Sequence, residues 1–125
     1  MIAFLDTHAV VALHDGRAEV FGKASRRLLT TADLRWSPAV AVELALLFEI
    51  GRVTVTSERI LARVASDLGA AEADDPFGAV AARAVRLTWA RDPFDRLIVA
   101  HADLHDAPLI SRDGRIGEHF SRAVW

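Results

Sequence analysis

Cysteine is absent from this 125-residue chain, and lysine occurs only at position 23. Without cysteine the chain has no disulfide framework, no thiolate metal site and no cysteine nucleophile. No apolar run approaches the roughly 20 residues that a membrane-spanning helix needs. Residues 1–5 lead directly to Asp6, with no basic leader and no small-residue cleavage site, which is unlike a signal peptide. These absences predict a soluble, cytoplasmic protein with no membrane partner.

Apolar residues make up 52% of the sequence, enough for the core of a single domain covering residues 1–125. The net charge of -2 is unlike that of a strongly basic nucleic-acid-binding domain. Every basic residue except Lys23 is an arginine. A coding bias of the source genome would explain this, and so would recognition of phosphate or carboxylate, which suits guanidinium better than ammonium. The sequence leaves both interpretations open.

Strand and helix signals alternate along the chain, without internal repeats, low-complexity tracts or linkers. Ile2 to Leu5 is a continuous apolar run, typical of a strand buried on both faces of a parallel sheet. Shorter strand candidates are Leu34 to Trp36, Val53 to Thr56 (or an extended connection), Ala70 to Ala73, Ala107 to Ser111 and Ala123 to Trp125. Helices are predicted around Val10 to Leu13, from about Glu19 to Thr30, from Ala39 to Ile50, from Ser57 to Gly69, from Asp75 to about Val85 and from Asp92 to about His105. The alternation predicts a three-layer α/β/α domain around a central, mostly parallel sheet.

The segment from Asp92 to Arg96 is typical of a helix start. Asp92 can cap the helix, Pro93 suits its first position, and Asp95 completes an acidic capping box. Ser37 and Pro38 repeat the pattern of a cap followed by proline.

Four carboxylates stand alone in four separate segments: Asp6, Glu43, Asp95 and Asp113. Asp6 and Asp113 follow predicted strands, and ligands of parallel α/β sheets bind at the carboxyl ends of strands. Each also has a structural interpretation: Asp6 as a helix cap, Asp113 in an Asp-Gly turn, and Asp95 at a helix dipole. Between Pro38 and Phe48, Glu43 is the only charged residue of a nearly all-apolar stretch of helix, so it needs an arginine, a proton or a metal. The pattern permits one acidic pocket.

Five motifs in order resemble those of PIN-domain ribonucleases, and within that group the chain is most similar to VapC, the toxin of bacterial toxin-antitoxin pairs. The resemblance covers essentially the whole sequence. Its motifs are Asp6-Thr7, Ser37-Pro38 leading to Glu43, Asp92-Pro93-Phe94-Asp95-Arg96, Ser111-Arg112-Asp113 and Val124-Trp125.

The resemblance implies a PIN-like fold in which Asp6, Glu43, Asp95 and Asp113 hold Mg²⁺ or Mn²⁺ for hydrolysis of RNA phosphodiesters. These hard cations prefer oxygen ligands, which agrees with an acidic set without cysteine. Bound metal relieves carboxylate repulsion and activates water. Three further residues are expected to support this site, namely Thr7, Ser111 and, less directly, Asp92.

The resemblance also implies partners: an RNA substrate, a VapB-like antitoxin, a second copy in a homodimer, and DNA only through the antitoxin. The antitoxin tail is expected to direct a basic side chain into the acidic pocket, and the apolar second helix region and the segment after Ile50 are the candidate grooves. Phosphate contacts are expected from arginines close in sequence to the acids, whose alternative role is a surface ion pair. These are Arg96, Arg112 and Arg115.

Two other functions remain to be weighed. A receiver-type phosphoacceptor module is also a small doubly wound domain, but it needs paired acids after the first strand and a lysine near the last, whereas Asp6 is unpaired and Lys23 lies in the first half. A PIN-like scaffold without catalysis is the other alternative. His101 and His105 have a zinc-compatible spacing, but no third ligand is evident from the sequence, so no metal is predicted there. His8 could touch substrate, and no role as general base is assigned to it.

Overall fold

Five short parallel strands form the central sheet in the computed structural model, which describes residues 1–125. The strands are β1 (Ile2–Leu5), β2 (Asp33–Trp36), β3 (Ala71–Glu72), β4 (Leu109–Ile110) and β5 (Ala123–Val124). Their order across the sheet is β3-β2-β1-β4-β5, and every neighbouring pair is parallel. The register places Phe4 of β1 beside Arg35 of β2 and Leu109 of β4. The chain therefore builds outwards from β1 in one direction and then returns to build in the other.

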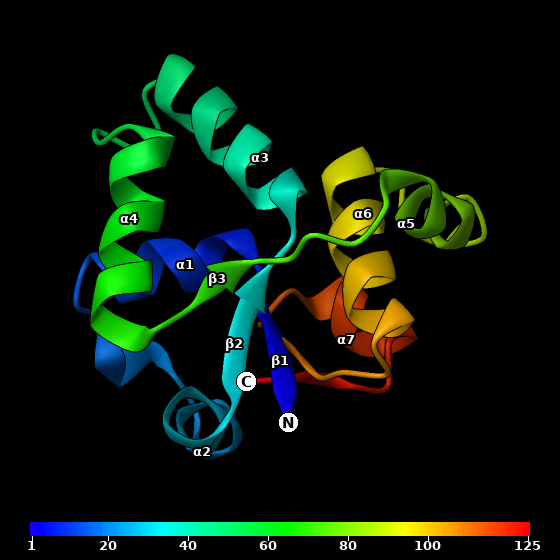
Figure 1. The fold of residues 1–125 in the computed structure, drawn as a ribbon, viewed down its shortest axis with the longest axis horizontal. Coiled ribbons are helices and arrows are strands. Elements are labelled where there is room, and N and C mark those ends of the chain that lie inside the picture. The colour runs from blue at the N-terminus through cyan, green and yellow to red at the C-terminus, as the bar shows by residue number, and fades with distance from the viewer.

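Seven α-helices and one 3-10 helix surround the sheet. They are α1 (Thr7–His14), η1 (Ala18–Val20), α2 (Lys23–Thr31), α3 (Pro38–Glu49), α4 (Ser57–Leu68), α5 (Phe77–Ala84), α6 (Pro93–Leu104) and α7 (Gly114–His119). Helices α1, α2 and α4 lie on one side of the sheet and α5, α6 and α7 on the other, while α3 extends beyond the carboxyl end of β2 (Figure 1). None of the helices is both long and apolar enough to cross a membrane. The predicted three-layer α/β/α fold is confirmed.

The core explains why β1 is apolar throughout its length. Ala3, Phe4 and Leu5 are completely buried, because helices cover both faces of the strand. They belong to a cluster of 25 buried residues that also includes Leu44 of α3 and Ile98 of α6. The strand thus has a fixed position, and so does the residue that follows it, Asp6.

Helix ends are set by the local signals that the sequence carries. Ser37 accepts a hydrogen bond from the Ala39 N–H at 3.3 Å and caps α3, with Pro38 in the first turn. Gly69 ends α4 in a left-handed conformation with φ of +67°. Ser57 lies one residue inside α4, because Thr56 occupies the cap position, and its hydroxyl donates to the Ala41 carbonyl at 2.8 Å.

The predicted helix from Glu19 to Thr30 is two separate elements, η1 and α2. They are separated by Phe21, which is buried in the core, and Gly22. A Cβ atom on Gly22 would lie 2.6 Å from the carbonyl oxygen of Trp125, so the C-terminal residue packs directly on this break. Of the two alternatives for residues 53–56, the structure has the connection and no strand. Asp113-Gly114, expected as a turn, begins α7.

Candidate active site

The candidate site lies where the strand order reverses, at the carboxyl ends of β1 and β4. Asp6 directly follows β1, and the segment from Ser111 to Asp113 follows β4. Because these strands are parallel neighbours, their carboxyl ends meet at the same edge of the sheet. Helices α3 and α6 bring Glu43 and Asp95 to the same edge. This is the location at which ligands bind in open α/β sheets.

Asp6 is the most enclosed of the acids, with only 4% of its surface exposed. Its Oδ1 accepts a hydrogen bond from the Thr7 N–H at 2.7 Å, which caps α1. Its Oδ2 accepts one from the Ser111 hydroxyl at 2.6 Å. The Ser111 oxygen in turn accepts from the Asp113 N–H at 3.2 Å. Ser111 therefore connects Asp6 with Asp113, although the two are far apart in sequence.

Glu43 of α3 is held in place by Thr7 of α1. The Thr7 hydroxyl donates to Oε1 of Glu43 at 2.5 Å, which links α1 to α3. Burial raises the pKa of Glu43 above its ordinary value, and the negative charges of Asp6 and Asp92 act in the same direction, while the Thr7 hydrogen bond opposes them. The Thr7 hydrogen bond thus orients the Glu43 carboxylate, while burial and the nearby negative charges destabilise its ionised form.

The start of α6 supplies the remaining acids. Asp92 caps the helix and accepts from the N–H groups of Phe94 and Asp95, at 2.7 and 3.3 Å. The expected capping box is incomplete, because no hydrogen bond returns from the Asp95 side chain to Asp92. Burial, followed by the charges of neighbouring carboxylates, raises the pKa of Asp95 to about 7. Those neighbours are Asp92, Asp6, Asp113 and Glu43.

These acids surround one cavity of about 430 Å³. The structure brings together all four predicted acids together with Asp92 and Thr7, whereas Ser111 stands behind Asp6 and does not line the cavity. Apolar side chains cover part of the wall. The lining residues are Asp6, Thr7, His8, Val11, Arg17, Glu43, Leu47, Arg52, Val53, Asp92, Asp95, Arg112 and Asp113.

His8 joins this lining in a fixed orientation. Its Nε2 accepts a hydrogen bond from the Arg112 N–H at 3.0 Å, so its Nδ1 carries the proton. That Nδ1 faces Oδ2 of Asp6 at 3.5 Å. The geometry favours a role for His8 in orienting Asp6 and the loop at Arg112 over a role as a base.

Only one of the three predicted phosphate-binding arginines, Arg112, lines the cavity. The Nε of Arg96 donates to the Ala90 carbonyl at 2.6 Å, and that of Arg115 donates to the Trp89 carbonyl at 2.7 Å. Both guanidinium groups are therefore engaged by the loop before α6, outside the cavity lining. Proximity in sequence to an acid did not place these two side chains beside it.

Arg17 and Arg52 line the cavity and were missed by the sequence analysis. Each follows a glycine of positive φ at the end of a helix, Gly16 at +70° and Gly51 at +79°. This Gly-Arg pair is not a sufficient signal, because Gly114 also precedes an arginine that lies outside the cavity. The three arginines of the lining nevertheless give an acidic cavity a positive rim.

A second group of ligand-type side chains lies apart from the acids. Asp75, which the sequence analysis placed at the start of a helix, makes no capping hydrogen bond, and α5 begins at Phe77. Instead its carboxylate contacts both His101 and His105, as the third ligand-type side chain that was not evident from the sequence. It is the only place in the chain where three such ligand atoms lie within 4.8 Å of one another.

The residues around the acidic cavity fit a hard divalent cation. Their donor atoms are carboxylate and hydroxyl oxygens, which Mg²⁺ and Mn²⁺ prefer. Burial, followed by the negative charge of neighbouring carboxylates, raises the pKa values of Glu43 and Asp95, and a bound cation would offset both effects. The wider spacing of these acids is also consistent with Mg²⁺, which usually retains several water molecules.

Comparisons with known proteins agree with the fold. VapBC2 from Rickettsia felis, solved with a DNA fragment from its promoter, is similar over 100% of this chain and 98% of its own, with 16% identity and a TM-score of 0.69. A toxin-antitoxin complex from Klebsiella pneumoniae gives 98% and 96% coverage, 21% identity and a TM-score of 0.68. VapBC-1 from nontypeable Haemophilus influenzae is similar over 100% of this chain and 96% of its own, with 17% identity and a TM-score of 0.66.

No curated protein sequence matches this chain. The family model of the PIN domain matches residues 3–122, which include all the acids of the cavity. Since that match covers nearly the whole sequence, the chain belongs to the PIN domain family.

Proposed function

We propose that this chain is a VapC-type toxin, a Mg²⁺- or Mn²⁺-dependent endoribonuclease that a VapB-like antitoxin holds inactive. The observation that carries the proposal is the convergence of acids from four separate segments on one cavity. The similar folds of the VapBC and toxin-antitoxin structures support the pairing with an antitoxin. An RNA substrate would place its action in the cytoplasm.

Asp6, Glu43, Asp95 and Asp113 would hold the cation. When bound, Mg²⁺ or Mn²⁺ supplies positive charge that polarises the scissile phosphate and makes water a better nucleophile. Ser111 and Thr7 fix two of the carboxylates through their hydroxyl groups.

Asp92 adds negative charge beside Asp95 but is already engaged as a helix cap. We assign it a supporting role. The apolar wall of Val11, Leu47 and Val53 would exclude part of the solvent from the reacting phosphate.

Arg17, Arg52 and Arg112 are the best placed residues to bind the RNA backbone. Their guanidinium groups can hold phosphates without reading bases, and they stand at the same cavity as the acids. Arg96 and Arg115 would need to leave carbonyl partners to do so.

The antitoxin would cover exposed apolar residues at the end of α3. Val42, Leu46, Phe48 and Ile50 are 41% to 66% exposed, and they lead into the segment after Ile50. An amphipathic segment laid on this surface would end close to Arg52 and the acidic cavity. A basic side chain of the antitoxin could then enter among the carboxylates. We also propose that the chain forms a homodimer, because symmetric pairing is the commonest form of assembly among small soluble proteins.

The decisive experiment is an RNA-cleavage assay with Mg²⁺ or Mn²⁺, with and without a chelator. Cleavage is expected with metal and is expected to disappear in Asp6→Asn and in Asp95→Asn, because each removes a charged ligand. Asp67→Asn on the outer surface of α4 is the matched control and should cleave like the wild type. Circular dichroism checks that the variants are folded. Full activity in either site variant would refute the assignment, and a folded wild type that never cleaves would favour the scaffold alternative.

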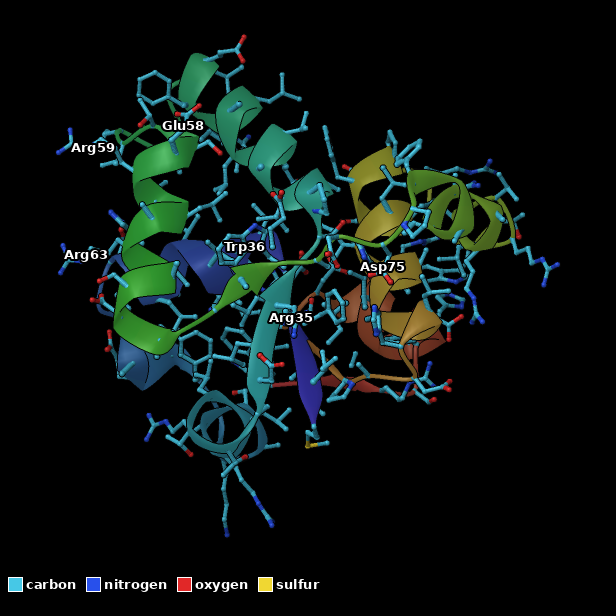
Figure 2. The ribbon with its side chains drawn as sticks, in the orientation of Figure 1. Arg35, Trp36, Glu58, Arg59, Arg63 and Asp75 are labelled. Atoms are coloured by element: carbon cyan, nitrogen blue, oxygen red, sulfur yellow. The ribbon has the colours of Figure 1, made fainter.

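A second experiment tests the arginines through the salt dependence of RNA binding. Each phosphate contact to single-stranded RNA contributes about 0.7 to the slope of log affinity against log salt. Arg52→Ala and Arg112→Ala are therefore each expected to reduce the slope by about 0.7. Arg59→Ala, whose side chain points outwards from α4 (Figure 2), is the control and should leave the slope unchanged. Unchanged slopes in both cavity variants would argue against phosphate contacts there.

A further inference from the structure

Asp75, His101 and His105 form a compact group of ligand atoms, and none of the three lines the acidic cavity. Nε2 of His101 lies 2.8 Å from Oδ2 of Asp75, and Nε2 of His105 lies 2.7 Å from the same oxygen. His101 belongs to α6 and His105 is the C-cap residue of that helix, while Asp75 belongs to the segment between β3 and α5, which runs past the helix (Figure 2). Three donors from two segments thus converge on one point.

Both imidazole rings are held in place before any ligand binds. They lie one helical turn apart with ring centroids 6.2 Å from each other and planes inclined by only 20°. Phe4 of β1 packs against both, at 5.2 Å from His101 and 5.4 Å from His105. Two histidines at positions i and i+4 of a helix present their nitrogens on one face, which is a recurring arrangement for zinc. Packing against Phe4 of the buried strand β1 therefore keeps the Nε2 atoms of both histidines directed at Asp75.

Ser37 provides the partner that a metal-binding histidine needs at its second nitrogen. Nδ1 of His101 lies 3.1 Å from the Ser37 hydroxyl, and His101 is 1% exposed. That hydroxyl can accept a hydrogen bond from Nδ1–H, which leaves the lone pair of Nε2 directed at the ligand point. The same residue caps α3, so its position does not depend on the histidine.

A cation could reach the group from solvent. The side chains of Asp75 and His105 are 22% and 27% exposed, so the group has a buried floor at His101 and an open side. A cavity of about 170 Å³ lined by Ser37, Asp75 and His101 adjoins it and has room for water as a further ligand. The side chain between the histidines does not compete, because Asp103 is bound to Arg83 and Arg122.

We propose that Asp75, His101 and His105 form a zinc site that is separate from the acidic active site. Two imidazole nitrogens and one carboxylate oxygen are ligands that Zn²⁺ accepts, and water would complete four-coordination. Zinc–ligand distances of about 2.0 to 2.1 Å require the three donors to move apart by about 0.5 Å as the ion replaces the protons they share. A hard cation such as Mg²⁺ would be a poor match for the two imidazoles.

The position of the site indicates a structural role. It joins the segment before α5 to α6, the helix whose first turn carries Asp92 and Asp95. His101 lies six residues after Asp95, about 9 Å along the helix axis. Bound zinc would therefore fix the orientation of α6 and with it one wall of the active site.

The test is calorimetric titration of the metal-free full chain with ZnCl₂. The wild type is expected to bind zinc with a one-to-one stoichiometry. His105→Gln and Asp75→Asn are each expected to weaken binding by more than about tenfold, because each removes one of three ligands. His14→Gln is the matched control, since His14 also contacts an aspartate, at 3.0 Å, but in an isolated pair. Asp95→Asn is the control for zinc bound in the acidic cavity. Both controls should bind as the wild type does.

Two further measurements decide between the outcomes. Zinc should raise the melting temperature of the wild type and of both controls but not of His105→Gln or Asp75→Asn, and circular dichroism should show all variants folded without zinc. Wild-type affinity in both ligand variants would overturn the proposal and leave the group as a set of hydrogen bonds. Loss of binding in Asp95→Asn alone would also overturn it, because the zinc would then occupy the acidic cavity. Neither result bears on whether the chain cleaves RNA.

Discussion

Asp95 shows how much of this site depends on the surroundings of a single carboxyl group. In isolation an aspartate ionises near its ordinary pKa of 3.8, but burial and its acidic neighbours raise the pKa of Asp95 to about 7. The folded chain therefore holds this proton more tightly than the unfolded chain does. A cation bound among the carboxylates would remove that preference, because it stabilises the ionised form.

The pH dependence of stability follows from this shift. Since the pKa of Asp95 is raised on folding, its contribution to stability is present at low pH and is lost as pH rises through about 7. The melting temperature of the metal-free protein is expected to fall between about pH 5 and about pH 8, and Asp95→Asn should flatten that fall. Excess Mg²⁺ should raise the melting temperature most at the alkaline end. An equally steep fall in Asp95→Asn would contradict this account, with Asp67→Asn as the control.

Arginines illustrate the opposite case, in which the residue type alone says little. Arg52 and Arg112 reach the cavity, whereas Arg96 is engaged by a backbone carbonyl. A long flexible side chain can take many directions from one backbone position. Its final contacts depend on which acceptors the neighbouring segments offer, and the sequence does not state these.

Helix α6 carries two separate groups of polar side chains because its two ends face different parts of the fold. Its first turn carries Asp92 and Asp95 at the acidic cavity, and its last turns carry His101 and His105 against Phe4. Proline at the first position and the Asp92 cap fix where the helix starts. The start thus sets the positions of both groups together, since the helix is rigid between them.

Glycines at the helices of the outer layers give a direct test of element boundaries. Gly69 adopts φ of +67° at the end of α4, so Gly69→Ala is expected to lower the free energy of unfolding by about 1 kcal/mol. Gly78 lies within α5 with open space around its Cβ position, so Gly78→Ala should raise it by about 0.5 kcal/mol. Urea denaturation measures both. Changes of the same sign would show that the two glycines do not have these roles.

Trp125, the last residue, contacts residues of the first part of the chain and of the cavity lining. Its Nε1 donates to the Val20 carbonyl at 2.7 Å, and its ring lies 4.6 Å from that of Phe21. The same ring stands 5.6 Å from His8, and the guanidinium carbon of Arg112 lies 5.5 Å from its centroid. The C-terminal residue therefore closes the fold and supports two residues of the cavity lining.

Two substitutions of Trp125 separate the contribution of its ring packing to the free energy of unfolding from that of its hydrogen bond. Trp125→Ala is expected to lower the free energy of unfolding by about 3 kcal/mol, the lower end of the range for large aromatic truncations, since Trp125 is only partly buried. Trp125→Phe retains the ring contacts and loses one hydrogen bond, so it should cost about 1 kcal/mol. Urea unfolding distinguishes the two. Equal losses would mean that the hydrogen bond, and not the packing, is the main contribution.

The sequence by itself determined the fold class and most helix boundaries, and it predicted the acids that meet at the cavity. These features depend on short-range patterns: an apolar strand, a cap with proline, a glycine after a helix. Even Glu43 could be singled out, because one carboxylate in the apolar stretch between Pro38 and Phe48 has no local explanation. The break between η1 and α2 was missed, since it depends on Gly22 meeting a residue at the opposite end of the chain.

Only the tertiary structure decided which side chains meet. Asp75 looks like a helix cap in the sequence, yet it turns to two histidines of another element. Arg17 enters the cavity lining, while Arg115 does not. Local periodicity fixes the course of the backbone, because helices and strands are built from neighbours in sequence. The contacts of a long polar side chain are settled only when separate elements pack together and offer it a partner.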